Sequence, residues 1–303
     1  MVREDTIVAQ HALLEHTSEL TQRVETALSV ELDRLAGACP ERLLAAMRHS
    51  LMSGGKRLRP LLVLLAADAC EGSLTEAMPA AVAVELVHTY SLIHDDLPAM
   101  DDDDMRRGRP ACHVAFDEAT AILAGDALLT LAFEVVGRSV KPAGRAAACC
   151  VVLAEAAGPL GMVAGQVDDL AAEGHAGTIE DLEAIHRRKT GALLTAALRL
   201  GAVSAGAIEK QLAALVQFGE YLGLAFQIKD DLLDVAGDPT TLGKRTGQDE
   251  KVGKLTYPAL LGVAASQQRI EELIHQARRS LQPLGQDGTW LAAVADYVKE
   301  RDH

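Results

Sequence analysis

Aromatic residues are scarce in this chain: they make up 3% of its 303 residues, and alternating runs of β-branched residues are absent. Such alternation marks strands with one buried face, so its absence argues against β-sheets. Alanine and leucine are abundant instead and recur at helical spacing. We therefore predict an all-α protein.

The cysteines lack the spacing of a zinc or redox site, since no C-x-x-C pair occurs. The five cysteines all lie in apolar or helical contexts; they are Cys39, Cys70, Cys112, Cys149 and Cys150. We expect buried free thiols in a reducing compartment.

Long uncharged apolar runs are also lacking. A membrane-spanning helix needs about 18 such residues or more, and Asp126, Glu155 and Arg199 each interrupt a candidate. The first residues do not form the apolar core of a signal peptide. We expect a soluble, cytoplasmic protein with no stable membrane insertion.

Positive charge is in deficit, because the net charge is −14. This argues against nucleic acids and anionic membrane surfaces as partners, although local cations could still bind an anionic substrate. Hydrophobic residues make up 49% of the chain, enough for a sizeable core. The length suits one large domain or two ordinary ones.

Acidic residues, in contrast, are concentrated in one stretch. Six aspartates lie between Asp95 and Asp104, after the apolar run 80–93, and Arg106, Arg107 and Arg109 follow. Carboxylates suit Mg²⁺ and guanidinium groups suit phosphate, so the stretch predicts a Mg²⁺–diphosphate site. A solvated, charge-balanced helix end is the ordinary alternative.

The chain is expected to turn within this stretch. On an unbroken helix Asp95 and Asp101 would diverge by about 120°, but Pro98 favours a break near Leu97. We expect Asp95 on the helix and Asp101 on a returning segment, both directed at one ion.

A second acidic site occurs downstream, where Asp230 and Asp234 are four residues apart in an apolar run. Such a pair shares one helix face and repels unless a cation binds. Basic segments lie at 54–60 and 187–191, and a Gly/Lys-rich loop at 238–254 could close over a phosphate. Each basic segment could also be ordinary: a helix C-terminus, surface cations or a mobile loop.

These motifs stand in a consistent order from Gly54 to Leu260: GGKRLRP, the two aspartate-rich motifs, RRG, RRKTG, FQIKDD and LGKRTGQDEKVGKLTYPAL. Together they closely resemble those of the trans-isoprenyl diphosphate synthases. The segment from Tyr90 to His113 looks like the bacterial farnesyl diphosphate synthases in particular.

The resemblance implies a single domain over residues 1–303, built as a bundle of antiparallel helices around a large central cavity, and a homodimer. It implies a prenyltransferase that condenses isopentenyl diphosphate with dimethylallyl or geranyl diphosphate. The reaction would proceed by ionisation, condensation and elimination, with three Mg²⁺ in the active site.

Site residues follow from the resemblance. The implied metal ligands are Asp95, Asp96, Asp101, Asp230, Asp231 and Asp234. The implied isopentenyl diphosphate site is Lys56, Arg59, His88 and Arg107. The implied allylic diphosphate site is Arg106, Lys189, Thr190, Gln227, Lys244 and Lys254. The residues expected to act most directly in catalysis are Asp95, Asp96, Asp101, Arg106, Lys189, Asp230 and Lys244.

Product length should depend on Tyr90, which lies five residues before Asp95, or about 7.5 Å back along the helix. The resemblance implies that a bulky aromatic here stops growth at farnesyl diphosphate. The neighbouring Ser91 is small, so geranyl and geranylgeranyl products stay open.

Two other function classes would share part of this pattern. A terpene cyclase would share the fold, but cyclases commonly line their pockets with aromatics, and the basic set of Lys56, Arg59 and Arg107 is intact here. A non-catalytic, metal-binding helical subunit would be expected to lose acids from one motif, and both motifs are complete.

Overall fold

The computed structural model describes residues 2–236 and 254–301. Its helices are α1 Val2–Asp33, α2 Glu41–Leu51, α3 Leu58–Asp68, α4 Leu74–Asp95, α5 Cys112–Ala115, α6 Glu118–Ser139, α7 Ala143–Ala157, α8 Met162–Ala172, α9 Ile179–His186, α10 Ala192–Ala205, α11 Glu209–Ala236, α14 Tyr257–Leu261, α15 Val263–Ser280 and α16 Thr289–Glu300. A π-helical turn spans Arg187–Gly191, and a 3₁₀ segment spans Gln282–Gly288. The prediction of an all-α protein is confirmed.

One small β-hairpin departs from that prediction. Strands β1 Met105–Arg106 and β2 Arg109–Pro110 pair antiparallel, with Arg106 opposite Arg109. The two residues between them, Arg107 and Gly108, have φ angles of 52° and 73°. Positive φ at both turn residues matches the twist of a tight hairpin, and glycine adopts it without strain.

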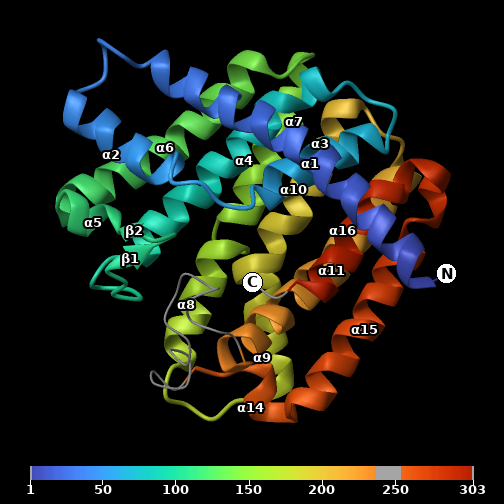
Figure 1. The fold of residues 1–303 in the computed structure, drawn as a ribbon. Helices are drawn as coiled ribbons and strands as arrows, with labels where there is room; N and C mark the ends of the chain where they lie inside the picture. Colours follow the sequence, from blue (N-terminus) through green and yellow to red (C-terminus); the bar gives the residue numbers. More distant parts are fainter. Residues whose placement is uncertain (1, 237–253, 302–303) are drawn as a thin grey trace.

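The centre of the bundle is formed by α4, α10 and α11 (Figure 1). Helix α10 packs against α3, α4, α7 and α11, and α4 packs along α6. The buried side chains are mostly small or aliphatic, as in the fully buried run 62–67 of α3. Small side chains allow these helices to approach one another closely, which explains how a core with few aromatics is filled.

Helix α4 begins and ends as its sequence predicts. The Ser73 side chain accepts a hydrogen bond from Glu76 N at 3.4 Å and caps the first turn. The helix ends at Asp95, three residues before Pro98. The chain then turns back, and Asp101 N donates to Asp95 O at 2.8 Å. The predicted break is thus confirmed, and it brings Asp101 beside Asp95.

Two stretches, Glu118–Ser139 and Ala143–Ala172, are long and apolar enough to cross a membrane by length and composition alone. The first is α6, which packs along α4, and the second covers α7 and α8. Core helices of soluble proteins meet the same test. All five cysteines are free thiols, as predicted; Cys70, Cys112 and Cys149 are buried, whereas Cys39 and Cys150 are only half-buried, contrary to the prediction.

The loop predicted to close over a phosphate lies almost wholly outside the described residues. Lys244 falls there, so the structure does not place this predicted site residue. Lys254 is described and is half-buried.

Candidate active site

The first acidic segment separates its two leading aspartates. Asp95 is half-buried at the end of α4, whereas Asp96 is buried to 2% exposure. Asp96 Oδ1 accepts from Arg106 Nε at 2.9 Å and also from Arg106 Nη2. Consecutive helical residues point about 100° apart, so one carboxylate stays available while the other is held by the hairpin. Bonding of this kind does not favour the predicted role of Asp96 as a metal ligand.

Arg107 turns away from Arg106 across the hairpin and reaches the loop before α3. Its Nη1 donates to Gly54 O and lies 3.5 Å from Ser53 Oγ. A Cβ at Gly55, where φ is 124°, would lie 2.6 Å from Arg107 Cζ. Glycine suits this position, because its φ angle is one that other residues rarely adopt and a Cβ would displace the guanidinium.

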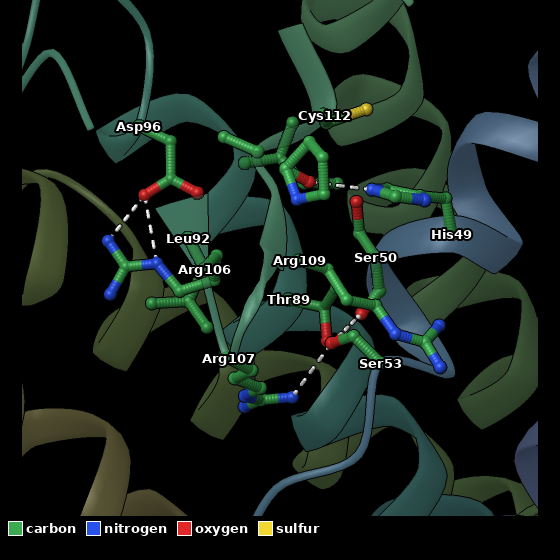
Figure 2. Close-up of a pocket in the computed structure, with 13 residues that line it drawn as sticks. His49, Ser50, Ser53, Thr89, Leu92, Asp96, Arg106, Arg107, Arg109 and Cys112 are labelled. Atoms are coloured by element: carbon green, nitrogen blue, oxygen red, sulfur yellow. Dashed lines mark hydrogen bonds and ion pairs between the residues drawn. The ribbon is translucent and has the colours of Figure 1, made fainter. Parts of the chain in front are cut away.

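A pocket opens behind the acidic segment, between α2, α4 and the hairpin (Figure 2). Arg106, Arg107 and Asp96 line it together with Thr89, whose Oγ1 is buried without a hydrogen-bond partner in the described structure. His49 Nε2 lies 2.8 Å from Pro110 O at its edge. The pocket therefore shares charged groups with the predicted diphosphate site.

Below this pocket, Arg57 forms a buried ion cluster. Its Nη1 lies 2.6 Å from Glu85 Oε1, its Nε 2.6 Å from Glu25 Oε1 and its Nη2 2.6 Å from Leu51 O. The Arg57 and Glu85 side chains are 0% and 1% exposed. Arg57 takes a positive φ of 48° immediately before α3. The cluster therefore fixes the backbone that presents Lys56 and Arg59.

Arg59 and His88 lie near each other and differ in charge at neutral pH. Burial lowers the pKa of Arg59 to about 10, against the charges of Glu85 and Asp230, which raise it. Its Nε is buried and has no hydrogen-bond partner among the described residues. Burial, then Arg59 and Arg107, depress the pKa of His88 well below its usual value. Arg59 stays cationic and His88 is a neutral imidazole at pH 7.

The second acidic site repeats the division seen in the first. Asp230, on α11, keeps 39% of its side chain exposed, and its Oδ1 lies 2.5 Å from Arg301 Nη2. The guanidinium of Arg301 also stacks over the Phe226 ring at 4.0 Å and donates to Phe226 O. A cation from the end of the chain thus compensates the Asp230 carboxylate.

Asp231 is buried on the other side of α11. Its Oδ2 accepts from Tyr257 N at 3.0 Å and lies 3.3 Å from His186 Nε2. Those contacts tie α14 to α11 and α9. Protein donors already occupy this carboxylate, so a role as a metal ligand is not favoured. Asp234 is half-buried one turn after Asp230, as the predicted shared face requires.

The basic segment 187–191 departs from regular helix. It forms a π turn between α9 and α10, a form that occurs mostly as single turns, often at functional sites. Lys189 Nζ lies 2.6 Å from Asp169 Oδ2, and Thr190 Oγ1 donates to Gln227 Oε1 at 2.7 Å. The predicted pair of Thr190 and Gln227 is therefore adjacent.

Electrostatic contacts connect the groups of the two acidic sites. Burial raises the pKa of Asp95 to about 6, the charge of Lys189 opposes this, and Asp101 adds to it. The charge of Asp230 raises the pKa of Arg59. Lys254 Nζ lies 3.9 Å from Asp101 Oδ1. Residues from α4, the π turn, α11 and the segment after 253 thus share one electrostatic environment.

The carboxylates fit a divalent cation that has a second source of ligands. Within residues 2–236 and 254–301, no three His, Cys, Asp or Glu side chains form a ready-made metal group. Asp101 Oδ1 is nevertheless buried without a hydrogen bond in this part of the chain. Mg²⁺ is commonly held by one or two carboxylates and substrate phosphates, and this donor set suits that arrangement.

Tyr90 lies on α4, buried to 7% exposure. Its ring meets His94 edge-on at 5.8 Å between centroids. Burial and the charge of Asp95 raise the pKa of Tyr90 to about 12, so it is a neutral phenol within the field of Asp95. Ser91 is also buried and donates to His88 O at 2.8 Å.

Sequence reasoning missed three features of the site: the π turn, the ion pair of Asp169 with Lys189 and that of Arg301 with Asp230. The arginine lies 71 residues from its partner, and nothing local indicates the contact. The basic residues beside Gly191 are evident in the sequence, but their spacing is that of an ordinary helix and does not indicate a π turn.

Known proteins share both the sequence and the fold. A model of the family described as polyprenyl synthetase matches residues 40–285. The chain is 46% identical to the farnesyl diphosphate synthase of Geobacillus stearothermophilus, over 98% of this chain and 100% of that one. It is 50% identical to the farnesyl diphosphate synthase of Escherichia coli strain K12, over 84% and 88%. A geranylgeranyl diphosphate synthase of Cyanophora paradoxa is 41% identical, over 96% and 97%.

The fold agrees with these sequence relationships. The structure of a geranyltransferase from Legionella pneumophila superposes with a TM-score of 0.86 at 36% identity, over 96% of this chain and 98% of that one. The apo structure of an FPP/GFPP synthase from Zymomonas mobilis superposes with a TM-score of 0.85 at 34% identity, over 96% and 99%. This chain belongs to the polyprenyl synthetase family.

Proposed function

We propose that this prenyltransferase condenses isopentenyl diphosphate with dimethylallyl or geranyl diphosphate and releases farnesyl diphosphate. The observation that supports the proposal is that each acidic site keeps one accessible aspartate, Asp95 or Asp230, with a cation close to it. Arg59 lies in the field of Asp230, and Lys189 lies in the field of Asp95. Such a site suits a dianionic or trianionic group together with divalent metal.

The isopentenyl diphosphate is assigned to Lys56, Arg59, His88 and Arg107. The unpartnered Nε of Arg59 and the neutral imidazole of His88 support this, because both can donate to phosphate oxygen. The depressed pKa of His88 means that it contributes a hydrogen bond rather than a charge. Arg107, which is held by the loop at Gly54, orients the group from the other side.

The allylic diphosphate is assigned to Arg106, Lys189, Thr190 and Gln227, with Lys244 and Lys254 expected to close over it. Enzymes of this family are generally metal-dependent, and Mg²⁺ held by Asp95, Asp101, Asp230 and Asp234 would neutralise the departing diphosphate. Asp96 and Asp231 have structural roles instead. Asp96 accepts a hydrogen bond from Arg106, and Asp231 accepts one from the backbone of Tyr257.

The chain's own residues then do three things during the reaction. Lys189 and Arg106 stabilise negative charge as the allylic C–O bond breaks. The basic set around Arg59 holds isopentenyl diphosphate so that its C3–C4 double bond attacks the allylic cation. Apolar helix faces exclude water, which would quench that cation. Released diphosphate is assigned as the base for the C2 proton, since no side chain is an evident one.

Product chromatography tests the proposal most directly. The purified enzyme is incubated with Mg²⁺, isopentenyl diphosphate and either dimethylallyl or geranyl diphosphate. We expect farnesyl diphosphate as the main product from both starters, with one diphosphate released per condensation. Absence of diphosphate release would instead point to a non-catalytic subunit.

Replacing Tyr90 with alanine should lengthen the product. The buried ring lies on α4 one to two turns before Asp95, where a growing tail would run from the diphosphate along the helix. Tyr90→Ala is expected to shift the main product from farnesyl to geranylgeranyl diphosphate, resolved by chromatography of labelled products. Tyr90→Phe keeps the volume and should still give farnesyl diphosphate. An unchanged product from Tyr90→Ala would mean that Tyr90 is a core residue with no effect on product length.

Geranylgeranyl diphosphate is the alternative product. The small side chain of Ser91 lies on the same helix next to Tyr90 in sequence, and its hydroxyl donates to His88 O. The relative from Cyanophora paradoxa carries that product in its name. A C20 main product from the native enzyme would favour this alternative.

We further propose that residues 1–303 form a single domain that acts as a soluble, cytoplasmic homodimer. Apolar side chains exposed on α6, α7 and α8 support a partner surface; they are Ile122, Leu123, Val151, Val163 and Val167. Light scattering in solution tests this: a mass of one chain would contradict it.

A further inference from the structure

We infer that Gly165 and Gly223 are positioning residues for Lys189 and Thr190, and that with Asp169 and Gln227 they clamp the π turn from two sides. The inference rests on the proposed role of Lys189 and Thr190 in binding the allylic diphosphate. It assigns a function to two glycines that touch neither substrate nor metal.

On one side, the π turn packs against α8. A Cβ placed on Gly165 would lie 2.2 Å from Lys189 N and 2.6 Å from Lys189 Cα. No side chain fits there, because real Cβ atoms essentially never approach backbone so closely. Asp169 stands four residues after Gly165, on the same face of α8, and its Oδ2 lies 2.6 Å from Lys189 Nζ. The helix thus touches the backbone of Lys189 and holds its ammonium group at once.

On the other side, the π turn packs against α11, which again contributes a glycine and a polar side chain. A Cβ on Gly223 would lie 2.9 Å from Gly191 Cα. Gln227 stands four residues after Gly223, on the same face. Its Oε1 accepts from Thr190 Oγ1 at 2.7 Å. Each helix therefore contributes one glycine for close approach and, one turn later, one polar side chain for a hydrogen bond.

The position of this clamp makes it relevant to the reaction. A π turn places its side chains out of register with the helices on either side, so packing by neighbours must decide where they point. Lys189 lies close enough to Asp95 for its charge to act on that carboxylate. A displacement near 1 Å at such a site can cost about 100-fold in rate. The glycines thus set the distance between Lys189 and the first acidic segment.

The test compares three glycine-to-alanine variants. Gly165→Ala and Gly223→Ala add a methyl group against the π turn. Gly219→Ala is the control matched to Gly223→Ala: a Cβ at Gly219, also on α11, would lie 2.9 Å from Thr195 Cα and Leu198 Cδ1 on α10, one turn beyond the π turn. All three should lower the melting temperature, since all three overpack a buried contact.

Only the two clamp variants should change ligand binding. Gly165→Ala is expected to weaken binding of inorganic pyrophosphate with Mg²⁺, measured by titration calorimetry, by about 10- to 100-fold. The KM for the allylic substrate should rise, while the KM for isopentenyl diphosphate stays within about twofold. Gly223→Ala should act in the same direction but less strongly, because its overlap is milder; it also serves if Gly165→Ala does not fold.

Hydrogen exchange of the peptide that covers residues 187–192 provides a readout that needs no ligand. Exchange there should quicken in Gly165→Ala and Gly223→Ala and stay as in the native enzyme in Gly219→Ala. Equal exchange in all three variants, or pyrophosphate binding that is lost equally in the control, overturns the clamp. A native enzyme that releases no diphosphate contradicts the proposed function instead, and leaves the exchange result to decide the clamp.

Discussion

Asp95→Asn should abolish most turnover and leave the fold at least as stable as before. Losing a carboxylate that would hold Mg²⁺ against the departing diphosphate is expected to cost about 10²–10³-fold in kcat. The folded metal-free state, by contrast, should become more stable. Burial raises the pKa of Asp95 from 3.8 to about 6, so the folded chain binds the proton more tightly than the unfolded chain. The ionised carboxylate therefore costs stability, in part from pH 3.8 upward and in full above about pH 6.

The measurement is kcat with Mg²⁺ beside the melting temperature in EDTA at pH 7.5. Asp230→Asn should lose turnover similarly; the amide is chosen because it can still accept from Arg301, which would otherwise be left buried beside Phe226. Two exposed acids serve as controls, Asp104→Ala in the same acidic run and Glu220→Ala on α11. Their kcat should stay near the native value. A matched fall in stability and turnover for Asp95→Asn would mean a structural role.

Glu85→Gln should produce the largest loss of stability. It leaves Arg57, whose side chain is 0% exposed, with the partly exposed Glu25 to balance its charge. Burial lowers the pKa of Arg57, and the two glutamates outweigh it and raise that pKa. Breaking a buried ion pair by removing one partner costs about 3–5 kcal/mol. Arg59 and Arg107 would also lose a nearby negative charge, since Glu85 raises the pKa of both.

Urea unfolding measures this loss, with Glu76→Gln as the control on the same helix. Glu76 is exposed, so its change should stay within about 0.5 kcal/mol. The double variant Arg57→Met/Glu85→Met should recover much of the stability, because it removes both charges at similar volume. A loss below about 1 kcal/mol for Glu85→Gln would show that water or Glu25 already compensates Arg57.

Residue spacing alone predicted part of the arrangement of the acidic motifs. The break near Pro98 and the return of Asp101 to Asp95 followed from the conformational limits of proline and the need to share one ion. The roles within each aspartate pair did not follow. Asp95 and Asp230 are accessible, whereas Asp96 and Asp231 are buried against Arg106 and Tyr257.

The sequence by itself determined the helical class, the break in the chain after Asp95 and the kind of chemistry. Those depend on local properties: side-chain period, capping residues, proline and the density of one charge sign. Only the tertiary structure decided which cation compensates which carboxylate, and where Lys189 points. Arg301 and Asp230 are far apart in the chain, and the π turn is held by glycines on two other helices. Such contacts depend on how distant helices pack, and no local pattern records that distance.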